Sequence, residues 1–179
     1  MRRSCSSAIV IVAAATTAAA EPKTAGIDAT LSEPLRPWRD AVGPGGGGSL
    51  WLRDPITPLV DVTIRLGAVV HTDRPIAQAM GARARLSEVP LVGGARYRLT
   101  DGSVRGYLEA EVGLVFARTD VDVAGVADSS SPIRLASELG AAIEVDRFEL
   151  RVGIWLADLS DLDHAIGIVA SLGGRVIAF

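Results

Sequence analysis

Histidines are the first candidates for chemistry in this sequence, because they supply general acids, general bases and metal ligands. His71 and His164 are the two histidines, and Asp73 and Asp163 lie close to them in the chain. A metal site or a histidine-dependent hydrolase would have to be built around one of these pairs. Isolated histidines of this kind are more often interfacial or loop residues. We therefore predict that the protein is not an enzyme and that it holds no metal or cofactor.

A second candidate is a calcium loop in the polar segment 118–132. Asp120, Asp122 and Gly125 match the first, third and sixth positions of such a loop. Ala124 stands where the third acid belongs, and Ser131 stands where the closing glutamate belongs. We therefore predict that the segment is a solvated surface loop.

Glu109 and Glu111 form a third candidate, since two nearby carboxylates can act as a general acid and a general base. They alternate with apolar neighbours, and six arginines share the same predicted strand face. A structural network of ion pairs explains that pattern better than a catalytic pair. We therefore turn to the elements that would position these charges.

The first twenty residues have the features of a secretory signal peptide. Arg2 and Arg3 precede a short apolar run at 8–15, and the small residues Ala18 and Ala20 come before Glu21. The run is shorter than the roughly 20 residues that a spanning helix needs. We predict cleavage after Ala20 and export of the mature chain.

The predicted mature chain contains no cysteine and carries a formal charge of −5, because Arg2 and Arg3 leave with the signal peptide. Its only lysine is Lys23, and no basic cluster stands out. Nucleic acid is therefore excluded as a partner. Residues 21–48 contain four prolines and the run 45–48 of four glycines. Such a composition predicts a flexible leader before the folded domain.

From residue 49 to 179 the pattern is that of strands. Apolar and polar residues alternate with period two in 60–70 and 148–156, which is typical of a strand with one apolar face. The same pattern extends over 91–99, 104–116 and 133–145, and short strands at 48–54, 76–86 and 165–179 complete a set of eight. The Asp101–Ser103 and Asp146–Arg147 joins are short enough for tight hairpins. The predicted fold is all-β. The export signal, the alternation of short with long joins and the final Phe179 favour an antiparallel transmembrane β-barrel over a soluble one.

Two of these segments also fit a helix. Residues 133–145 place Leu135, Leu139 and Ile143 at helical spacing, and residues 76–86 follow Asp73 and Pro75, which resemble a helix start. We predict a strand for both, and the helical alternative stays open for 76–86.

Charge separates the two faces of the five clearest strands. Their apolar face has 30 positions and carries no charge, whereas the 25 intervening positions carry twelve charges. We predict that these twelve residues form a paired network inside the barrel, because buried charges must be compensated. They are Asp61, Arg65, Arg96, Arg98, Arg105, Glu109, Glu111, Arg134, Glu138, Glu144, Glu149 and Arg151, and their formal charges sum to zero.

The stretches VPLVGGARYRL (89–99) and GYLEAEVGL (106–114) resemble the small outer-membrane β-barrels of the OmpA, OmpX and OmpW type. The final residues GRVIAF (174–179) are similar to the C-terminal signal that the barrel-assembly machinery reads in that family. The resemblance implies an eight-stranded barrel in contact with outer-membrane lipid, recognition of Phe179 during assembly, and a monomer.

The last strand departs from the family pattern. Counting back by twos from Phe179 reaches Ile177 and then Arg175, where an apolar residue is usual. A bulge near Arg175 would restore the pattern, and so would a shorter last strand. Aromatic residues, which usually form girdles at the two membrane interfaces, are also sparse.

Three functions fit these observations. The first is a structural or surface-interaction protein with a plugged, charge-paired interior. The second is a narrow channel for small or apolar molecules. The third, from another class, is a soluble periplasmic barrel that binds a ligand on an apolar inner face.

Overall fold

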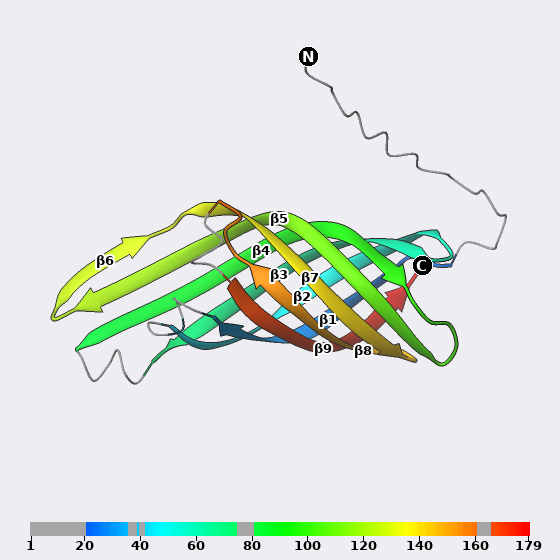
Figure 1. Ribbon diagram of the computed structural model, residues 1–179, viewed down its shortest axis with the longest axis horizontal. Helices are drawn as coiled ribbons and strands as arrows, with labels where there is room; N and C mark the ends of the chain where they lie inside the picture. The colour runs from blue at the N-terminus through cyan, green and yellow to red at the C-terminus, as the bar shows by residue number, and fades with distance from the viewer. Residues whose placement is uncertain (1–20, 36–38, 40–41, 75–80, 161–165) are drawn as a thin grey trace, which may run out of the picture.

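A computed structural model describes residues 21–35, 39, 42–74, 81–160 and 166–179. These residues form a closed antiparallel β-barrel (Figure 1). Its strands are β1 (Thr24–Pro34), β2 (Val42–Thr57), β3 (Val60–Asp73), β4 (Ala82–Arg98), β5 (Val104–Val123), β6 (Val126–Ser130), β7 (Ile133–Val145), β8 (Phe148–Leu156) and β9 (Ile166–Ala178). The predicted signal peptide, residues 76–80 of the predicted strand 76–86, Asp163 and His164 lie outside the described residues.

Eight of these strands make the wall of the barrel. The hydrogen-bonded order is β4-β3-β2-β1-β9-β8-β7-β5, and a β4–β5 pairing closes the ring. β6 pairs only with β5 among the described strands, so it is an addition to the ring and not part of the wall. The eight-stranded antiparallel barrel predicted from the sequence is confirmed.

The two ends of the barrel differ in their connections. At one end, which we call the turn end, β2–β3, β4–β5 and β7–β8 are joined by short turns, and β1 begins where β9 stops. The β7–β8 hairpin needs only Asp146 and Arg147, and Asp146 adopts a positive φ of 61°. The opposite end, the loop end, carries the longer connections 35–41, 74–81 and 157–165.

Alternation of burial explains why these sequences form a barrel. In β3 and β8 every second side chain is buried and the side chains between them are exposed. The exposed set is apolar, including Ile64, Leu150 and Ile154, whereas the buried set carries charges. The predicted orientation, with the apolar face outward, is therefore confirmed. Among the described residues no helix is both long enough and apolar enough to span a membrane.

The first strand of the barrel lies where the sequence predicts a flexible leader, so the leader assignment for 21–48 is wrong at 24–34 and at 42–48. β1 pairs with β2 on one side and with β9 on the other. Its inward residues Asp28, Thr30 and Ser32 are small or polar, and only Ile27 and Leu31 are large exposed hydrophobics. Because the two faces differ little in hydrophobicity, the period-two pattern is weak, and the segment forms a strand through its pairing with β2 and β9.

The glycine run lies in the middle of a strand as well. β2 spans 16 residues instead of the predicted seven, and Gly45–Gly48 pair with 29–32 in β1 and 68–71 in β3. Glycine has no side chain, so it shows no alternation and has weak strand preference. Hydrogen bonds from strands on both sides supply the order that local sequence does not.

Two predicted strands on either side of Pro90 form one continuous strand. The predicted segments 76–86 and 91–99 meet in β4, which runs through Pro90 and is strand from Ala82 onward. The β3–β4 register has no pairs at Val89 and Pro90, although both residues pair with β5. Proline cannot donate to a ladder, so the interruption falls on one side only. The count of eight is right, but β1 replaces one of the two predicted pieces of β4.

The predicted polar loop 118–132 is largely a β-hairpin. β5 continues to Val123, turns at Ala124 and Gly125, and returns as β6. Both turn residues have positive φ, 54° and 84°, as a two-residue hairpin turn requires. With the first residues of β4, this hairpin forms a three-stranded extension that projects beyond the loop end (Figure 1).

The last strand contains the bulge that would restore its apolar pattern. Gly26 pairs with Arg175 and Ala25 pairs with Ile177, so Val176 is the additional residue. Val176 and Ile177 are consequently both exposed on the outer surface. A bulge inserts one residue and reverses the parity of the strand beyond it.

Candidate functional site

The interior of the barrel holds one connected set of ion pairs, which we call the charge cluster. It comprises Asp28, Arg53, Asp61, Arg65, Arg96, Arg105, Glu109, Glu111, Glu138, Glu144, Glu149 and Arg151. Every barrel strand except β9 contributes a member, because each places alternate side chains inside the ring. The charge cluster is therefore a product of closure and not of any single segment.

Arg96 of β4 lies at the middle of this cluster, with a side chain only 1% exposed. Its Nη1 donates to Glu149 at 2.8 Å, and its Nε lies 3.3 Å from Glu109. Glu149 also accepts two hydrogen bonds from Arg53, at 2.6 and 2.7 Å. Bidentate pairing of this kind is the strongest arrangement available to an arginine and a carboxylate. The pairs tie β2, β4, β5 and β8 together across the lumen.

A second group of pairs lies nearer the loop end. Arg65 donates to Asp28 at 2.6 Å and to Glu111 at 3.2 Å. Arg151 lies 2.8 Å from Glu138 and 3.6 Å from Glu111. Glu111 therefore joins the two arginines, and β1, β3, β5, β7 and β8 are linked through this group.

Ten of the twelve interior residues expected from the sequence lie in the charge cluster, and two lie elsewhere. Arg98 pairs with Glu21 and Asp101 at the turn end, and Arg134 pairs with Asp158 at the loop end. These two arginines stand at strand ends, where an inward side chain reaches the mouth of the barrel instead of its middle.

Two cluster residues, Asp28 and Arg53, are absent from the sequence-based set. Both lie in strands whose sequence carries a weak signal, Asp28 in the predicted leader and Arg53 in the short predicted strand 48–54. The alternation of Ile27, Ala29 and Leu31 around Asp28 is the signal that could have found it.

The charge balance of the cluster differs from the prediction because Arg98 and Arg134 lie outside it, whereas the added Asp28 and Arg53 cancel each other. The cluster holds five arginines and seven carboxylates, a formal excess of two negative charges, instead of the predicted sum of zero. Glu109 is held by ion pairs alone: neither of its oxygens makes a hydrogen bond within the described part of the chain. Its three arginine partners lie 3.3, 3.9 and 4.0 Å away.

The space that remains inside the barrel is divided into small cavities. A cavity of about 40 Å³ is bounded by Arg65, Glu138, Arg151 and Trp155, and another of about 50 Å³ lies at the turn end. A water molecule needs roughly 10–15 Å³ by this measure, so each cavity has room for a few waters at most. The charge cluster lies between the two cavities.

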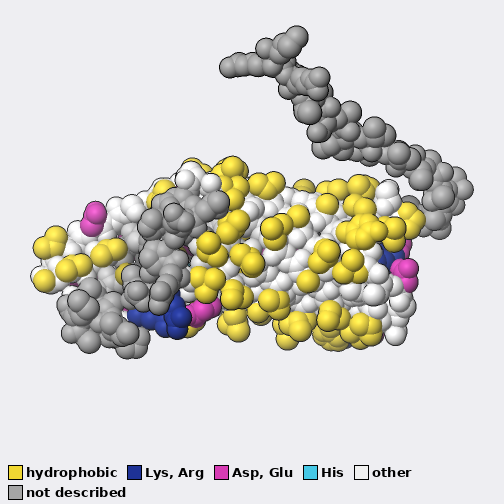
Figure 2. Space-filling view, viewed as in Figure 1, with side chains coloured by type: hydrophobic (Ala, Val, Ile, Leu, Met, Phe, Trp, Pro, Cys, Tyr) yellow, Lys and Arg dark blue, Asp and Glu magenta, His cyan; other side chains and the backbone are white. Residues whose placement is uncertain are grey.

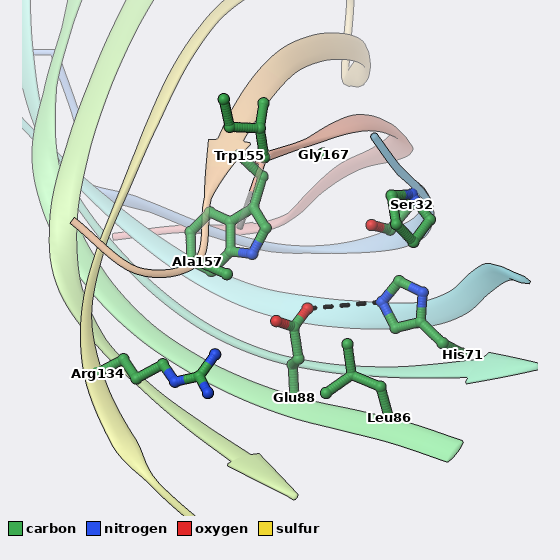
Figure 3. A pocket seen from close by; sticks show the side chains of 10 residues that line it. Ser32, His71, Leu86, Glu88, Arg134, Trp155, Ala157 and Gly167 are labelled. Carbon is green, nitrogen blue, oxygen red and sulfur yellow. Dashed lines mark ion pairs between the residues drawn. The ribbon is translucent and has the colours of Figure 1, made fainter. Parts of the chain in front are cut away.

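A third cavity, of about 30 Å³, lies at the loop end beside His71 (Figure 3). His71 is buried, with Nδ1 3.1 Å from the carbonyl oxygen of Gly43 and Nε2 3.5 Å from Glu88. Trp155 and Arg134 form other parts of the cavity wall. The contacts of His71 with Gly43 and Glu88 hold the start of β2 against β3 and β4, so His71 has a structural role. The imidazole was expected at an interface or in a loop, and it lies inside the barrel instead.

The outer surface of the barrel wall is apolar. On the face seen in Figure 2, hydrophobic side chains cover the wall between the two ends, and charged side chains lie towards the ends. Leu108, Val112, Leu139 and Val152 are each half exposed in the middle of this surface. A soluble ligand-binding barrel would have the opposite arrangement, so that alternative is wrong.

Solved structures with the same architecture are small outer-membrane barrels. No protein-family model matches the chain, and comparison with curated proteins finds no match. Ail, the attachment invasion locus protein of Yersinia pestis, aligns with a TM-score of 0.62 at 13% identity, over 87% of this chain and 97% of Ail. Neisserial surface protein A aligns with a TM-score of 0.54 at 18% identity, over 86% and 96% of the two chains.

The N-terminal β-barrel domain of Pseudomonas aeruginosa OprF aligns with a TM-score of 0.50 at 13% identity, over 88% of this chain and 99% of that domain. The fold is that of an eight-stranded outer-membrane β-barrel. An apolar exterior around a polar, charge-paired interior is the arrangement that a lipid bilayer requires of such a barrel. The chain resembles these proteins in fold, so its role has to be inferred from its own residues.

Proposed function

We propose that this outer-membrane barrel is a plugged anchor that presents the β4–β6 extension at the cell surface. The observation that carries the proposal is the charge cluster, which crosses the lumen and separates the cavities on either side of it. An eight-stranded barrel has an interior that side chains can just fill. The proposed role is non-enzymatic and needs no cofactor.

The competing function is a narrow channel. A channel would need a continuous water-filled path, whereas the cavities inside the barrel wall are only about 30, 40 and 50 Å³, and the charge cluster lies between the last and the other two. If the cluster moved aside, several buried charges would lose their partners at once, and unpaired buried charges are costly. The filled lumen therefore favours the plug.

Purified protein in planar lipid bilayers is expected to show no large, steady conductance. The physical reason is that arginine–carboxylate pairs from seven strands block the path of an ion. Folding of each sample is checked by a heat-dependent shift in its mobility on SDS gels, because a closed ladder resists detergent until it is boiled. Reproducible channels of uniform size in folded samples would rule out the plug while leaving the barrel intact.

The extension is the proposed working surface. Short turns face the periplasm and longer loops face the exterior in barrels of this class, which places the loop end outside the cell. All five residues of β6 are exposed, including Val126, and this strand has a free edge within the described structure. A free edge can pair with another chain. The names of two similar proteins, an attachment invasion locus protein and a surface protein, agree with a surface role.

Shortening the extension is expected to leave the stability of the barrel unchanged. Replacing 122–127 by Asn-Gly would join the paired residues Val121 and Asp128 through a two-residue turn. Because the deleted residues lie beyond the barrel wall, the free energy of unfolding should change by less than about 0.5 kcal/mol. Urea titration followed by tryptophan fluorescence measures it. A loss of several kcal/mol would show that the extension is structural, which contradicts the proposed role.

We further propose that Phe179 is recognised by the barrel-assembly machinery and that the barrel is a monomer in outer-membrane lipid. Phe179 follows β9 and is 65% exposed, and its backbone N–H donates to the backbone carbonyl oxygen of Lys23 at 2.9 Å. The ring is therefore accessible at the turn end, while the backbone is hydrogen-bonded to the residue that precedes β1. Cleavage of residues 1–20 as a signal peptide stays a prediction from the sequence.

A further inference from the structure

The cavity at the turn end differs from the rest of the lumen in its charge. Its wall contains five arginines and three carboxylates, although the chain as a whole has a formal charge of −3. The arginines are Arg53, Arg96, Arg98, Arg105 and Arg175, and the carboxylates are Glu21, Asp61 and Glu144. We call this cavity, of about 50 Å³, the arginine vestibule. It is a dead end, because the charge cluster closes it from the loop end.

Aromatic rings hold two of these arginines in place. The guanidinium carbon of Arg53 lies 3.9 Å from the ring centre of Trp51, and that of Arg96 lies 3.5 Å from the ring centre of Tyr107. A stacked guanidinium uses its flat face, so its N–H edge stays available for an anion in the same plane. Glu149, which lies deeper in the barrel, takes up part of the charge of both arginines.

The positive charge at the opening comes from the other three arginines. Arg98 and Arg105 stand at the two ends of the β4–β5 turn, and Arg175 stands near the end of β9. Arg105 approaches Glu144 only to 3.7 Å, and Arg175 donates to the backbone carbonyl of Asp146 at 3.4 Å. Neither contact is a short pair with a carboxylate, so both arginines can accept a closer anion.

One carboxylate of the chain already occupies this opening. Glu21 lies just before β1 and accepts hydrogen bonds from Arg98 at 2.9 and 3.0 Å. Its hydrogen bonds with Arg98, together with the charges of Arg105 and Arg175, hold the pKa of Glu21 below its usual value despite partial burial. Glu21 is therefore ionised at neutral pH. Its side chain is 46% exposed, so a competing anion can reach the same guanidinium groups.

We propose that the arginine vestibule binds a small soluble oxyanion of the phosphate or carboxylate class, and that Glu21 is a built-in competitor for it. Planar guanidinium groups recognise both kinds of anion through paired N–H donors. The vestibule lies inside the wall, away from the apolar surface that contacts lipid, so the anion comes from the aqueous compartment and not from a lipid headgroup. This proposal is independent of the proposed plug, since the same arginines would line the mouth of the barrel if its lumen were open.

The test uses inorganic phosphate as the probe. The full barrel in non-ionic detergent is titrated at neutral pH and constant ionic strength, and binding is followed by phosphorus NMR. Replacing Glu21 with glutamine removes the competitor, so phosphate affinity should rise at least about tenfold, which corresponds to the loss of one charge-assisted pair. Adding Arg98→Gln or Arg105→Gln to the Glu21→Gln background should abolish this gain. Each variant must keep its heat-dependent mobility on SDS gels.

Asp120→Asn is the matched control, because Asp120 forms an exposed ion pair with Arg118 at the opposite end of the barrel. It removes one carboxylate and changes the net charge as Glu21→Gln does. Equal phosphate affinity in the parent, Glu21→Gln and Asp120→Asn proteins would overturn the proposal. So would a Glu21→Gln, Arg98→Gln double variant that binds phosphate as tightly as Glu21→Gln alone.

A competition experiment distinguishes the source of the anion. Phosphate bound to the Glu21→Gln barrel should remain bound when the protein is transferred to vesicles of phosphatidylcholine with or without phosphatidylglycerol. Loss of bound phosphate only in the vesicles that contain phosphatidylglycerol would show that a lipid headgroup takes the site, which overturns the assignment to a soluble anion.

Discussion

Replacing Arg96 with methionine is expected to lower the free energy of unfolding by about 3–5 kcal/mol, the cost of leaving buried charges without their partner. Arg96 lies within 4 Å of Asp61, Glu109, Glu144 and Glu149, and its side chain is 1% exposed. Methionine fills much of the same space, so the loss would come from charge and hydrogen bonding more than from packing. Urea unfolding in detergent or vesicles, followed by the fluorescence of the inward tryptophans, measures the change.

The carboxylate partner should behave differently. Because the charge cluster has two more carboxylates than arginines, Glu109→Gln removes part of an excess. Glu109 also makes no hydrogen bond within the described residues, so its amide variant loses only long contacts. We expect a cost below about 1 kcal/mol, which is the net value of a single ordinary hydrogen bond. Equal losses for Arg96→Met and Glu109→Gln would contradict the charge imbalance.

An exposed arginine provides the control for this pair. Arg118 forms a surface ion pair with Asp120, and its side chain is 67% exposed. Surface pairs contribute about 0–1 kcal/mol, so Arg118→Met should have little effect on the free energy of unfolding. A large effect at this position would mean that the extension, and not the lumen, determines the stability of the barrel.

Adding a charge to the outer wall should lower the free energy of unfolding nearly as much as removing Arg96 from the lumen. Leu139 is the middle residue of β7 and is 57% exposed on the apolar surface. Arginine at the bilayer midplane of a transmembrane barrel costs about 2–4 kcal/mol, so Leu139→Arg should lower the free energy of unfolding by that amount. Measurement in lipid vesicles is essential, because detergent solvates a charge more readily than a bilayer does.

Val126→Arg is the matched comparison for the outer wall. Val126 is 74% exposed, but it lies in β6, beyond the barrel wall. The same change of side chain should therefore be almost neutral there, within about 0.5 kcal/mol. If Leu139→Arg is also neutral in vesicles, the apolar surface does not contact lipid.

Much of the barrel could be predicted from the sequence, because in several strands the alternation of side chains shows which face is apolar. β3, β7 and β8 keep large apolar residues on one face and all their charges on the other, and their bounds are close to the predicted ones. The absence of charge from the apolar face is compatible with lipid, where an unpaired charge would be too costly, but it left open a soluble barrel with that face turned inward. The tight turn at Asp146 and Arg147 could be predicted for a similarly local reason.

Only the tertiary structure decided where the ring closes and which charges meet. β1 and the glycine run of β2 have little alternation of their own, and they are strands because neighbours on both sides complete their hydrogen bonds. Closure brings Asp28 to Arg65 and Arg53 to Glu149, pairs that are 37 and 96 residues apart in the chain. Local sequence determines which way a side chain points, whereas the register of the closed ring determines which charge it faces. The sum of charges in the lumen and the identity of the arginine vestibule depend on that register.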